Sequence, residues 1–363
     1  MRSLPTLCFA LLVFITLPRP ARAEELAPEV AEKIKALVEK RLPPGGPGAA
    51  ITVIKEGQVI LEHGYGFADI QAKTPPAATT LFDLASVSKQ FTATAILLLA
   101  ERGQLSLEDD VRKYLPELPV YDAKHPVLVK DMLHMASGIP EYDTSGSDLK
   151  NPAKATNLEV LHNLAKTKQA DFEPNTKYAY TNTNYVLLAA IVERLSKKSM
   201  HEFLEAEIFK PLGMSHTTVQ DAEHLVKDFA TGYRKAKNGA FKTDHDLVTI
   251  TGDGNVFSCV EDLAKWDQAL REGKLLKPES WTLAHTSNKL KSGKDTEYGF
   301  GCEVSGTKYG RCIYHTGSWN GTSTCYAWYV DAKVSVIVLC NLSDFDAEEL
   351  GDTIAHQFMK PAK

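Results

Sequence analysis

The chain has 363 residues, of which 44% are hydrophobic and 24% charged, and its formal net charge is −5 at pH 7. This composition excludes a disordered or fibrous chain and supplies enough apolar side chain for a large core. Basic and acidic residues are mixed without blocks of like charge, so charge predicts no binding to nucleic acid or to an anionic membrane surface.

The first 23 residues have the pattern of a signal peptide. Arg2 precedes an apolar run from Leu7 to Leu17, and Ala21-Arg22-Ala23 is a small-x-small cleavage site. The run is too short to span a bilayer, which needs roughly 20 apolar residues, and no later segment is long enough. We therefore predict a periplasmic or secreted protein, cleaved after Ala23 and without stable membrane insertion.

The mature chain is expected to open with a helix and a hairpin. Residues 28–42 carry apolar side chains at helical spacing and end at Pro43. Two β-rich runs follow, 49–55 and 58–65, and the glycine in Glu56-Gly57 permits a tight turn between them.

The C-terminal quarter is again rich in β-branched and aromatic residues. The strands expected there span 298–304, 309–316, 322–330 and 334–341. A final helix follows, with one face formed by Ala347, Leu350, Ile354 and Phe358.

The middle of the chain predicts helices and irregular connections, most clearly Val87–Arg102, which Gly103 closes, and Asn184–Leu195. We therefore predict an α/β (α+β) fold in which both chain ends build one antiparallel sheet, flanked by the N- and C-terminal helices, with a mainly helical lobe inserted. The expected boundaries are 24–85 and 251–363 for the α/β lobe and 86–250 for the helical lobe, within one domain of residues 24–363.

Cysteine spacing gives no zinc pattern, and no metal or organic cofactor is expected. If Ala332-Lys333 is a two-residue turn between the last two strands, Cys325 faces Cys340 within reach of a disulfide. Cys302 and Cys312 flank another expected hairpin and are a second candidate pair. The alternative is that these cysteines are free and buried as small apolar residues.

The motif S-x-x-K occurs three times, and the surroundings of each copy differ. Ser86-Val87-Ser88-Lys89 begins an apolar helix, whereas the copies at Ser147 and Ser305 lie in polar stretches. Residues three apart on a helix share a face, so Lys89 is expected beside the Ser86 hydroxyl. Burial lowers the pKa of a lysine, which would let Lys89 accept a proton from a serine nucleophile. The alternative is an N-cap serine followed by a surface lysine.

Tyr180-Thr181-Asn182 follows a turn at Pro174-Asn175 and precedes a helix, so both outer side chains are expected at an exposed turn. A phenol near a lysine cation can ionise more easily and move a proton, and Asn182 can orient the lysine and a substrate carbonyl. By itself, Y-x-N is more often a helix cap with a packed ring.

His315-Thr316-Gly317 ends a β-rich run and precedes Ser318. Glycine at a strand end allows a ligand's backbone to approach closely. The N–H of Ser318 could complete an oxyanion hole with that of Ser86, because a helix N-terminus directs free N–H groups at the carbonyl under attack. By itself, the motif is more often a simple edge-strand turn.

In this order, S-x-x-K, Y-x-N and [HK]-T-G resemble the motifs of the serine β-lactamase and penicillin-binding-protein superfamily, specifically the class C β-lactamase and D-alanyl-D-alanine carboxypeptidase branch, which also includes esterases. The resemblance implies the β-lactamase/transpeptidase-like fold. The site residues that it implies are the nucleophile Ser86, the base Lys89, the second proton carrier Tyr180, the substrate-binding residues Asn182, His315, Thr316 and Gly317, and the oxyanion-hole N–H groups of Ser86 and Ser318.

The sequence departs from the family pattern at several positions. Met135-Ala136-Ser137-Gly138 stands where His-Thr-Ser-Gly is frequent, with His134 one position early. Asn175 and Asn255 stand where glycine is usual, and asparagine tolerates the left-handed conformation. His315 in place of lysine lowers the positive charge available to a substrate carboxylate at pH 7. Histidine occurs there in some family peptidases and Trp often in esterases, which favours a peptidase.

We therefore predict an exported serine hydrolase that forms an acyl-enzyme at Ser86 and acts on D-amino-acid peptides or β-lactam amides. Its partner would be a small molecule or peptide, such as a peptidoglycan stem peptide or a β-lactam, and not a nucleic acid. One alternative is a carboxylesterase on the same fold. Another is a non-catalytic protein that binds cell-wall peptide, which would not need Ser86, Lys89 and Tyr180 together.

Overall fold

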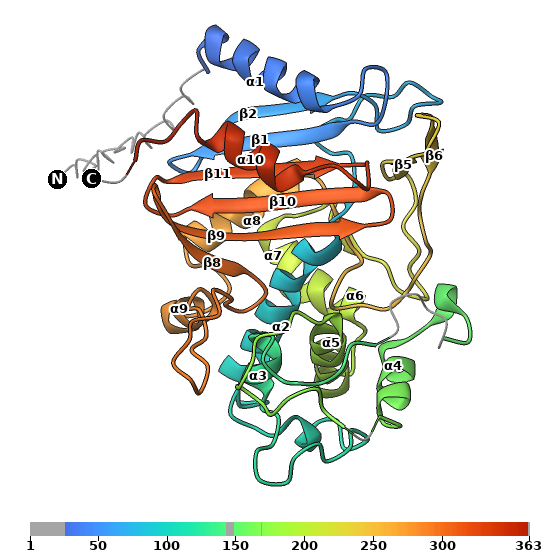
Figure 1. Cartoon of the computed structure of the whole chain (residues 1–363), viewed down its shortest axis with the longest axis vertical. Coiled ribbons are helices and arrows are strands. Elements are labelled where there is room, and N and C mark those ends of the chain that lie inside the picture. The colour runs from blue at the N-terminus through green and yellow to red at the C-terminus, as the bar shows by residue number, and fades with distance from the viewer. Residues whose placement is uncertain (1–25, 143–148, 168, 362–363) are drawn as a thin grey trace, which may run out of the picture.

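The two ends of the chain meet in one antiparallel sheet of six strands in the order β2-β1-β11-β10-β9-β8 (Figure 1). The N-terminal hairpin consists of β1 (Ala49–Lys55) and β2 (Gln58–Tyr65). The C-terminal strands are β8 (Glu303–Thr307), β9 (Gly310–Trp319), β10 (Thr322–Tyr329) and β11 (Val334–Cys340). Because β1 pairs with β11, the sheet joins both ends, which confirms the predicted fold class.

This structure is a computed structural model and describes residues 26–142, 149–167 and 169–361. The expected signal peptide at 1–23 and the cleavage site after Ala23 lie outside these ranges. Among the residues described, no helix is both long enough and apolar enough to cross a membrane.

Helices cover both faces of the large sheet. On one face, α1 (Pro28–Arg41) and α10 (Ala347–Ala355) pack through side chains such as Ile34 and Leu350. On the other face, α8 (Val260–Arg271) packs through Leu263 and Trp266. Successive residues of a strand point to opposite faces, so β1 and β11 are buried on both sides and consist mainly of apolar residues.

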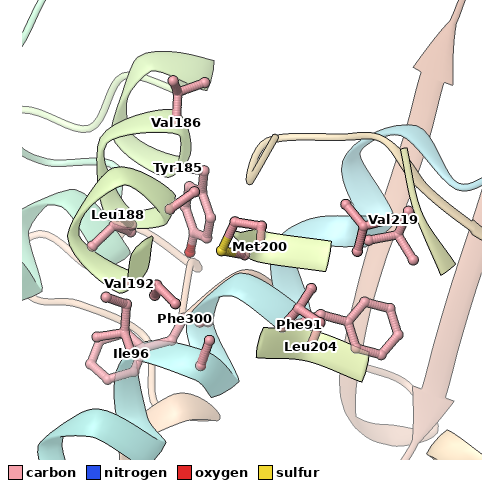
Figure 2. Close-up of a cluster of buried hydrophobic side chains, with 14 of the residues drawn as sticks. Phe91, Ile96, Tyr185, Val186, Leu188, Val192, Met200, Leu204, Val219 and Phe300 are labelled. Carbon is pink, nitrogen blue, oxygen red and sulfur yellow. The ribbon is translucent and has the colours of Figure 1, made fainter. Parts of the chain in front are cut away.

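The helical region is centred on α2 (Lys89–Glu101) and α5 (Asn182–Ser196), whose apolar side chains form one cluster with α6 (Met200–Leu204) (Figure 2). Every residue of α2 from Lys89 to Leu99 is buried. The remaining α-helices are α3 (Val129–Leu133), α4 (Asn157–Leu164), α7 (Lys210–Leu212) and α9 (Pro278–Ala284). The remaining strands are β3 (Phe82–Asp83), β4 (Thr218–Val219), β5 (Tyr233–Lys235), β6 (Phe241–Thr243) and β7 (Val256–Ser258).

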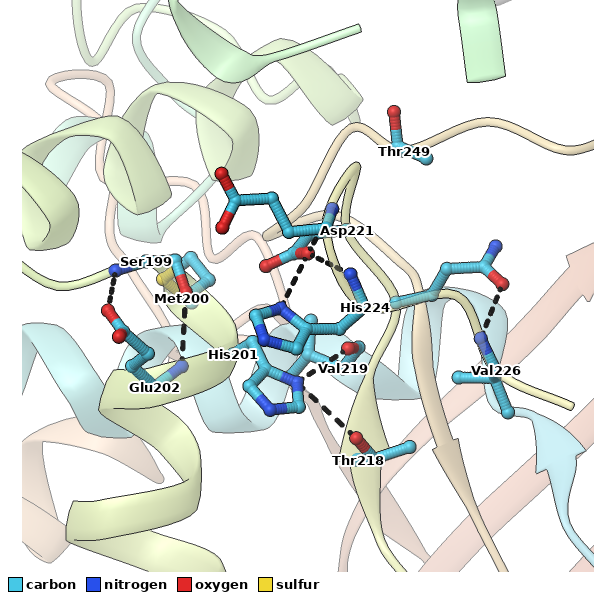
Figure 3. Close-up of polar contacts among 12 residues, drawn as sticks. Ser199, Met200, His201, Glu202, Thr218, Val219, Asp221, His224, Val226 and Thr249 are labelled. Carbon is cyan, nitrogen blue, oxygen red and sulfur yellow. Dashed lines mark hydrogen bonds and ion pairs between the residues drawn. The ribbon is translucent and has the colours of Figure 1, made fainter. Parts of the chain in front are cut away.

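Polar contacts hold α6 against β4 (Figure 3). Ser199 and Glu202 form a reciprocal capping box at the start of α6. The His201 Nδ1 lies 2.9 Å from the carbonyl oxygen of Val219 in β4, and its ring stacks on that of His224 at 3.8 Å between centroids. These side chains are thus part of the packing between α6 and β4.

Several predicted elements differ from the observed ones at their ends; α5, for example, begins at Asn182 and not at Asn184. Residues 85–88 form a 3-10 turn, so α2 begins at Lys89 and not at Val87. The strand expected over 298–304 begins only at Glu303, because the chain turns at Gly301, which has a φ of 68° and lies close to the carbonyl of Lys89.

The predicted register of the last hairpin is wrong. Four residues, and not two, connect Tyr329 to Val334, and Lys333 donates its N–H to the Val330 carbonyl. This longer turn shifts the pairing by two residues, so Cys325 faces Val338 and Cys340 faces Ser323. Cys312 faces Ser305. All five cysteines in the described ranges are buried and free, which overturns both proposed disulfides and agrees with the alternative.

Candidate active site

A cavity of about 400 Å³ lies where the end of β9 meets the start of α5 and the turn before α2. Six of the predicted site residues line it: Ser86, Tyr180, Asn182, His315, Thr316 and Ser318. Lys89 and Gly317 are not among its lining residues, and both are buried behind it.

The turn that carries Ser86 is held by the strands on either side of it. Ala85 has a φ of 45°, a conformation that an alanine rarely adopts, and its N–H donates to the Asp83 Oδ1 at 2.8 Å. The Thr324 hydroxyl of β10 donates to the Leu84 carbonyl at 2.8 Å. These contacts fix the backbone that positions the Ser86 side chain at the cavity.

Gly317 lies directly beneath this turn. A Cβ atom there would be 2.3 Å from the Leu84 carbonyl oxygen and 2.3 Å from the Thr324 Oγ1. The sequence predicts that the missing side chain of Gly317 admits a ligand's backbone. The contacts in the structure are instead with the turn before α2, so the glycine lets that turn pack against the sheet.

Gly317→Ala is expected to destabilise the protein by about 2 to 3 kcal/mol, because the new methyl group meets backbone that cannot move away easily. Urea unfolding measures this free energy. Gly306→Ala is the matched control, since a Cβ at Gly306 meets nothing within 4 Å. Equal stability of the two variants would contradict this account of Gly317.

Lys89 is fully buried and its ammonium is surrounded by oxygen atoms. Its Nζ donates to the Ser86 Oγ at 3.0 Å, to the Asn182 Oδ1 at 2.9 Å and to the Asp253 carbonyl at 2.8 Å. Burial lowers the pKa of Lys89 to about 8, and the charge of Asp253 opposes this shift. At pH 7 about a tenth of Lys89 is therefore neutral and can accept a proton.

If Lys89 is the base, kcat/KM for a neutral ester substrate is expected to rise with pH up to about 8 and then level off, because only the neutral amine accepts a proton. Burial also raises the pKa of Asp83 and of Asp253 to about 6, so the diagnostic part of the profile lies above pH 7. A pH-rate profile from 7 to 9.5 measures it. A flat profile over this range would remove Lys89 from the role of base.

Tyr180 lies beside Lys89, with its ring centroid 5.0 Å from the Lys89 Nζ. Tyr180 is 40% exposed, but protein atoms around its hydroxyl shield that group from water and raise its pKa above the usual value, although a hydrogen bond with Ser86 acts in the opposite direction. The net shift of the Tyr180 pKa is thus opposite in direction to the one expected from the nearby lysine cation. At neutral pH the phenol keeps its proton and can donate it.

His315 is buried, and both nitrogens of its ring are occupied. A carbonyl can only accept, so Nδ1 donates to the Thr316 carbonyl at 2.6 Å, and Nε2 accepts from the Tyr298 hydroxyl at 3.0 Å. Burial, reinforced by the charge of Lys89, lowers the pKa of His315 to about 3. The imidazole is neutral at pH 7 and offers no positive charge to a substrate.

His134, the residue before Met135-Ala136-Ser137-Gly138, contacts the residue that binds His315. The His134 Nδ1 lies 3.0 Å from the backbone carbonyl of Tyr298, whose hydroxyl contacts His315. Burial lowers the pKa of His134 to about 4. A neutral His134 thus helps to place the Tyr298 side chain.

Three polar residues near Lys89, namely Glu141, Tyr142 and Asp253, make contacts that the sequence did not predict. Glu141 accepts the backbone N–H of Asn182 at 2.7 Å and so caps the positive end of α5. Tyr142 donates its hydroxyl to the Asp253 Oδ2 at 3.1 Å. The cap residue and its helix are far apart in the chain, so no local pattern indicates this contact.

Two groups of side chains in the described ranges are close enough to hold a metal ion, and neither lines the cavity. One consists of His216, Cys259 and Asp262, and the other of Asp122, His125 and Glu173. Asp262 already accepts hydrogen bonds from the backbone of His216 and the ammonium of Lys265. Its contacts suit a structural role.

Comparisons with known proteins agree with this geometry. A family model described as Beta-lactamase matches residues 31–358. Penicillin-binding protein 4* of Bacillus subtilis is 33% identical over 301 residues, which are 78% of this chain and 66% of that protein. A D-aminopeptidase of Brucella anthropi is 29% identical over 306 residues, or 82% of this chain and 56% of that protein. The chain thus spans less than two thirds of the length of these curated relatives.

Among solved structures, the octameric penicillin-binding protein homologue from Pyrococcus abyssi superposes with a TM-score of 0.77 at 28% identity. The match covers 90% of this chain and 75% of that chain. The similarity therefore includes the sheet and the helical region together.

Proposed function

The chain belongs to the beta-lactamase family of serine hydrolases, and from this premise we propose that Ser86 is its nucleophile and forms an acyl-enzyme with an amide substrate. The observation that carries the proposal is the 3.0 Å contact between the Ser86 Oγ and the fully buried Lys89 Nζ at the wall of the cavity.

The proposed reaction begins when the neutral Lys89 amine takes the Ser86 proton while Oγ forms a bond to the substrate carbonyl carbon. The backbone N–H groups of Ser86 and Ser318 stabilise the negative oxygen. Tyr180, protonated at neutral pH, gives its proton to the leaving amine as the C–N bond breaks, and Lys89 returns a proton to Tyr180. Water then attacks the carbonyl carbon of the ester and gives a proton to Tyr180 or Lys89. The bond from the carbonyl carbon to the Ser86 Oγ breaks, and the serine takes the proton back. Asn182, bonded to Lys89, keeps the ammonium aligned.

The open edge of β9 supports a peptide-like substrate. β8 pairs with Gly310–Tyr314 alone, so among the described residues His315–Trp319 have a strand partner, β10, on one side only. Thr316 and Ser318 of this open segment line the cavity. An extended peptide can bind as an added strand at such an edge. Together with the D-aminopeptidase and penicillin-binding-protein relatives, this supports D-amino-acid peptides or β-lactam amides as the substrate class.

The experiment that tests the proposal is intact-mass measurement after mixing the protein with a penicillin, a D-alanyl-D-alanine peptide or an activated ester. An added mass equal to the acyl group, mapped by peptide digestion to Ser86, is the expected result. An adduct at another serine, or none with any probe, would contradict it. An adduct with the ester alone would favour a carboxylesterase.

We also propose that the protein is exported to the periplasm or secreted, on the basis of the apolar segment and cleavage site at its start. N-terminal sequencing of the protein recovered outside the cytoplasm is expected to begin at Glu24. Recovery of the protein with Met1 intact in the cytoplasm would contradict the proposal.

A further inference from the structure

We propose that Glu303 makes this site selective for substrates that carry a protonated amine near the scissile bond, and unfavourable for substrates that carry a carboxylate there. The inference rests on the proposed function, because it assigns the substrate class of the same cavity.

The charged side chains of the cavity wall are all acidic. Asp83, Asp253 and Glu303 line it, whereas its lining contains no lysine or arginine. The one basic side chain in the lining, His315, is neutral for the reasons given above. The ammonium of Lys89 lies behind the wall, where three oxygen atoms already accept its protons.

Asp83 and Asp253 already use their carboxylates inside the protein. Asp83 accepts the N–H of Ala85, and Asp253 accepts the hydroxyl of Tyr142. These contacts hold the turn before α2 and the surroundings of Lys89. Both aspartates are therefore less available than a free carboxylate to bind a cation on the substrate.

Like each aspartate, Glu303 accepts one hydrogen bond, but it differs from them in its surroundings. Asp83 is buried and the charge of Asp253 acts on Lys89, whereas Glu303 is half-buried. As the first residue of β8 it faces Tyr314 of β9, whose hydroxyl donates to Oε2 at 2.8 Å. In the part of the chain that the structure describes, the Glu303 Oε1 accepts no hydrogen bond, and no lysine or arginine forms an ion pair with Glu303. A partly buried carboxylate with one unpaired oxygen is stabilised when a ligand supplies a cation.

Aromatic side chains surround the region of this carboxylate. Tyr314 contacts it directly, and its charge contributes to the raised pKa of both Tyr178 and Tyr180, whose rings contact Tyr298 at 5.8 and 6.2 Å between centroids. An ammonium group is stabilised both by a carboxylate and by aromatic rings. The same surroundings repel a carboxylate, since no cation in the lining compensates its charge.

The test is a series of substrates that share one scissile bond and differ in charge. D-alanine p-nitroanilide carries an ammonium, its N-acetyl derivative is neutral, and its N-succinyl derivative carries a carboxylate. For the unmodified protein, kcat/KM is expected to fall in that order, with about a tenfold preference for the substrate that carries the ammonium over the neutral one. In Glu303→Gln this ratio is expected to fall to about threefold or less.

Glu279→Gln is the matched control, because Glu279 is exposed, lies in α9 and is not part of the cavity wall. It removes the same charge and is expected to keep the ratio of the unmodified protein. Equal ratios in the unmodified protein and Glu303→Gln, or an equal loss in Glu279→Gln, would overturn the inference.

A second measurement does not depend on turnover. In the Ser86→Ala background, calorimetry is expected to detect binding of D-alaninamide, and Glu303→Gln is expected to weaken it at least about threefold. N-acetyl-D-alaninamide binding as tightly as the amine would overturn the inference, even where an activated ester still acylates Ser86 in the natural sequence. Failure of every probe to acylate Ser86 would instead overturn the proposed function.

Discussion

Ser86→Ala is expected to lower kcat on the order of 10⁴-fold or more and to abolish the covalent adduct with a penicillin or a fluorophosphonate. The reason is that no other hydroxyl is placed within hydrogen-bond distance of the Lys89 Nζ in the described ranges. Turnover and intact mass are measured on the same preparation, with circular dichroism to show that the fold is kept.

Ser305→Ala is the matched control, because Ser305 begins another S-x-x-K copy but lies in β8 and outside the cavity wall. It is expected to keep full labelling and turnover. Equal labelling of Ser86→Ala and the natural sequence would exclude Ser86 as the nucleophile.

Lys89→Met and Tyr180→Phe are each expected to lower kcat on the order of 10³-fold, and the double variant is expected to be about as impaired as the worse single variant. Residues that act in one proton relay are not additive when removed together. Methionine at Lys89 fills a similar volume, so loss of activity would not simply follow from a cavity in the core.

Lys308→Met is the control for this pair, since Lys308 ends the S-x-x-K copy at Ser305 and is absent from the cavity wall. A double variant that lost the full product of the two single effects would show that Lys89 and Tyr180 act independently. Near-natural activity of either single variant would remove that residue from the mechanism.

The sequence predicted well what local patterns determine. Alternating and helical apolar spacing located the N-terminal helix and hairpin, the last three strands of the sheet and the two central helices, with errors at the ends of elements. The left-handed conformation expected where asparagine replaces glycine is present, with φ of 59° at Asn175 and 65° at Asn255. Steric preference acts within one residue, so it can be predicted without the fold.

Features that depend on contacts between distant segments could not be predicted in this way. The register of β10 and β11 depended on the length of one turn, and the two-residue turn assumed for Ala332-Lys333 was too short. The raised pKa of Tyr180 reflects shielding of its hydroxyl from water by segments that only the folded chain brings together. The contacts of Glu141 and of Gly317 join segments that only the folded chain brings together.

The pairing of β1 with β11 also has a consequence for how the chain folds. Lys55 of β1 pairs with Val334 of β11, although most of the sequence separates them. This separation makes loop closure slow relative to local helix formation. Until β11 has been synthesised, β1 presents an unpaired edge of apolar residues that can associate with other chains. A chain truncated before residue 334 would leave β1 and β10 without their shared neighbour, so such a fragment is expected to aggregate and not to fold as a smaller version of the protein.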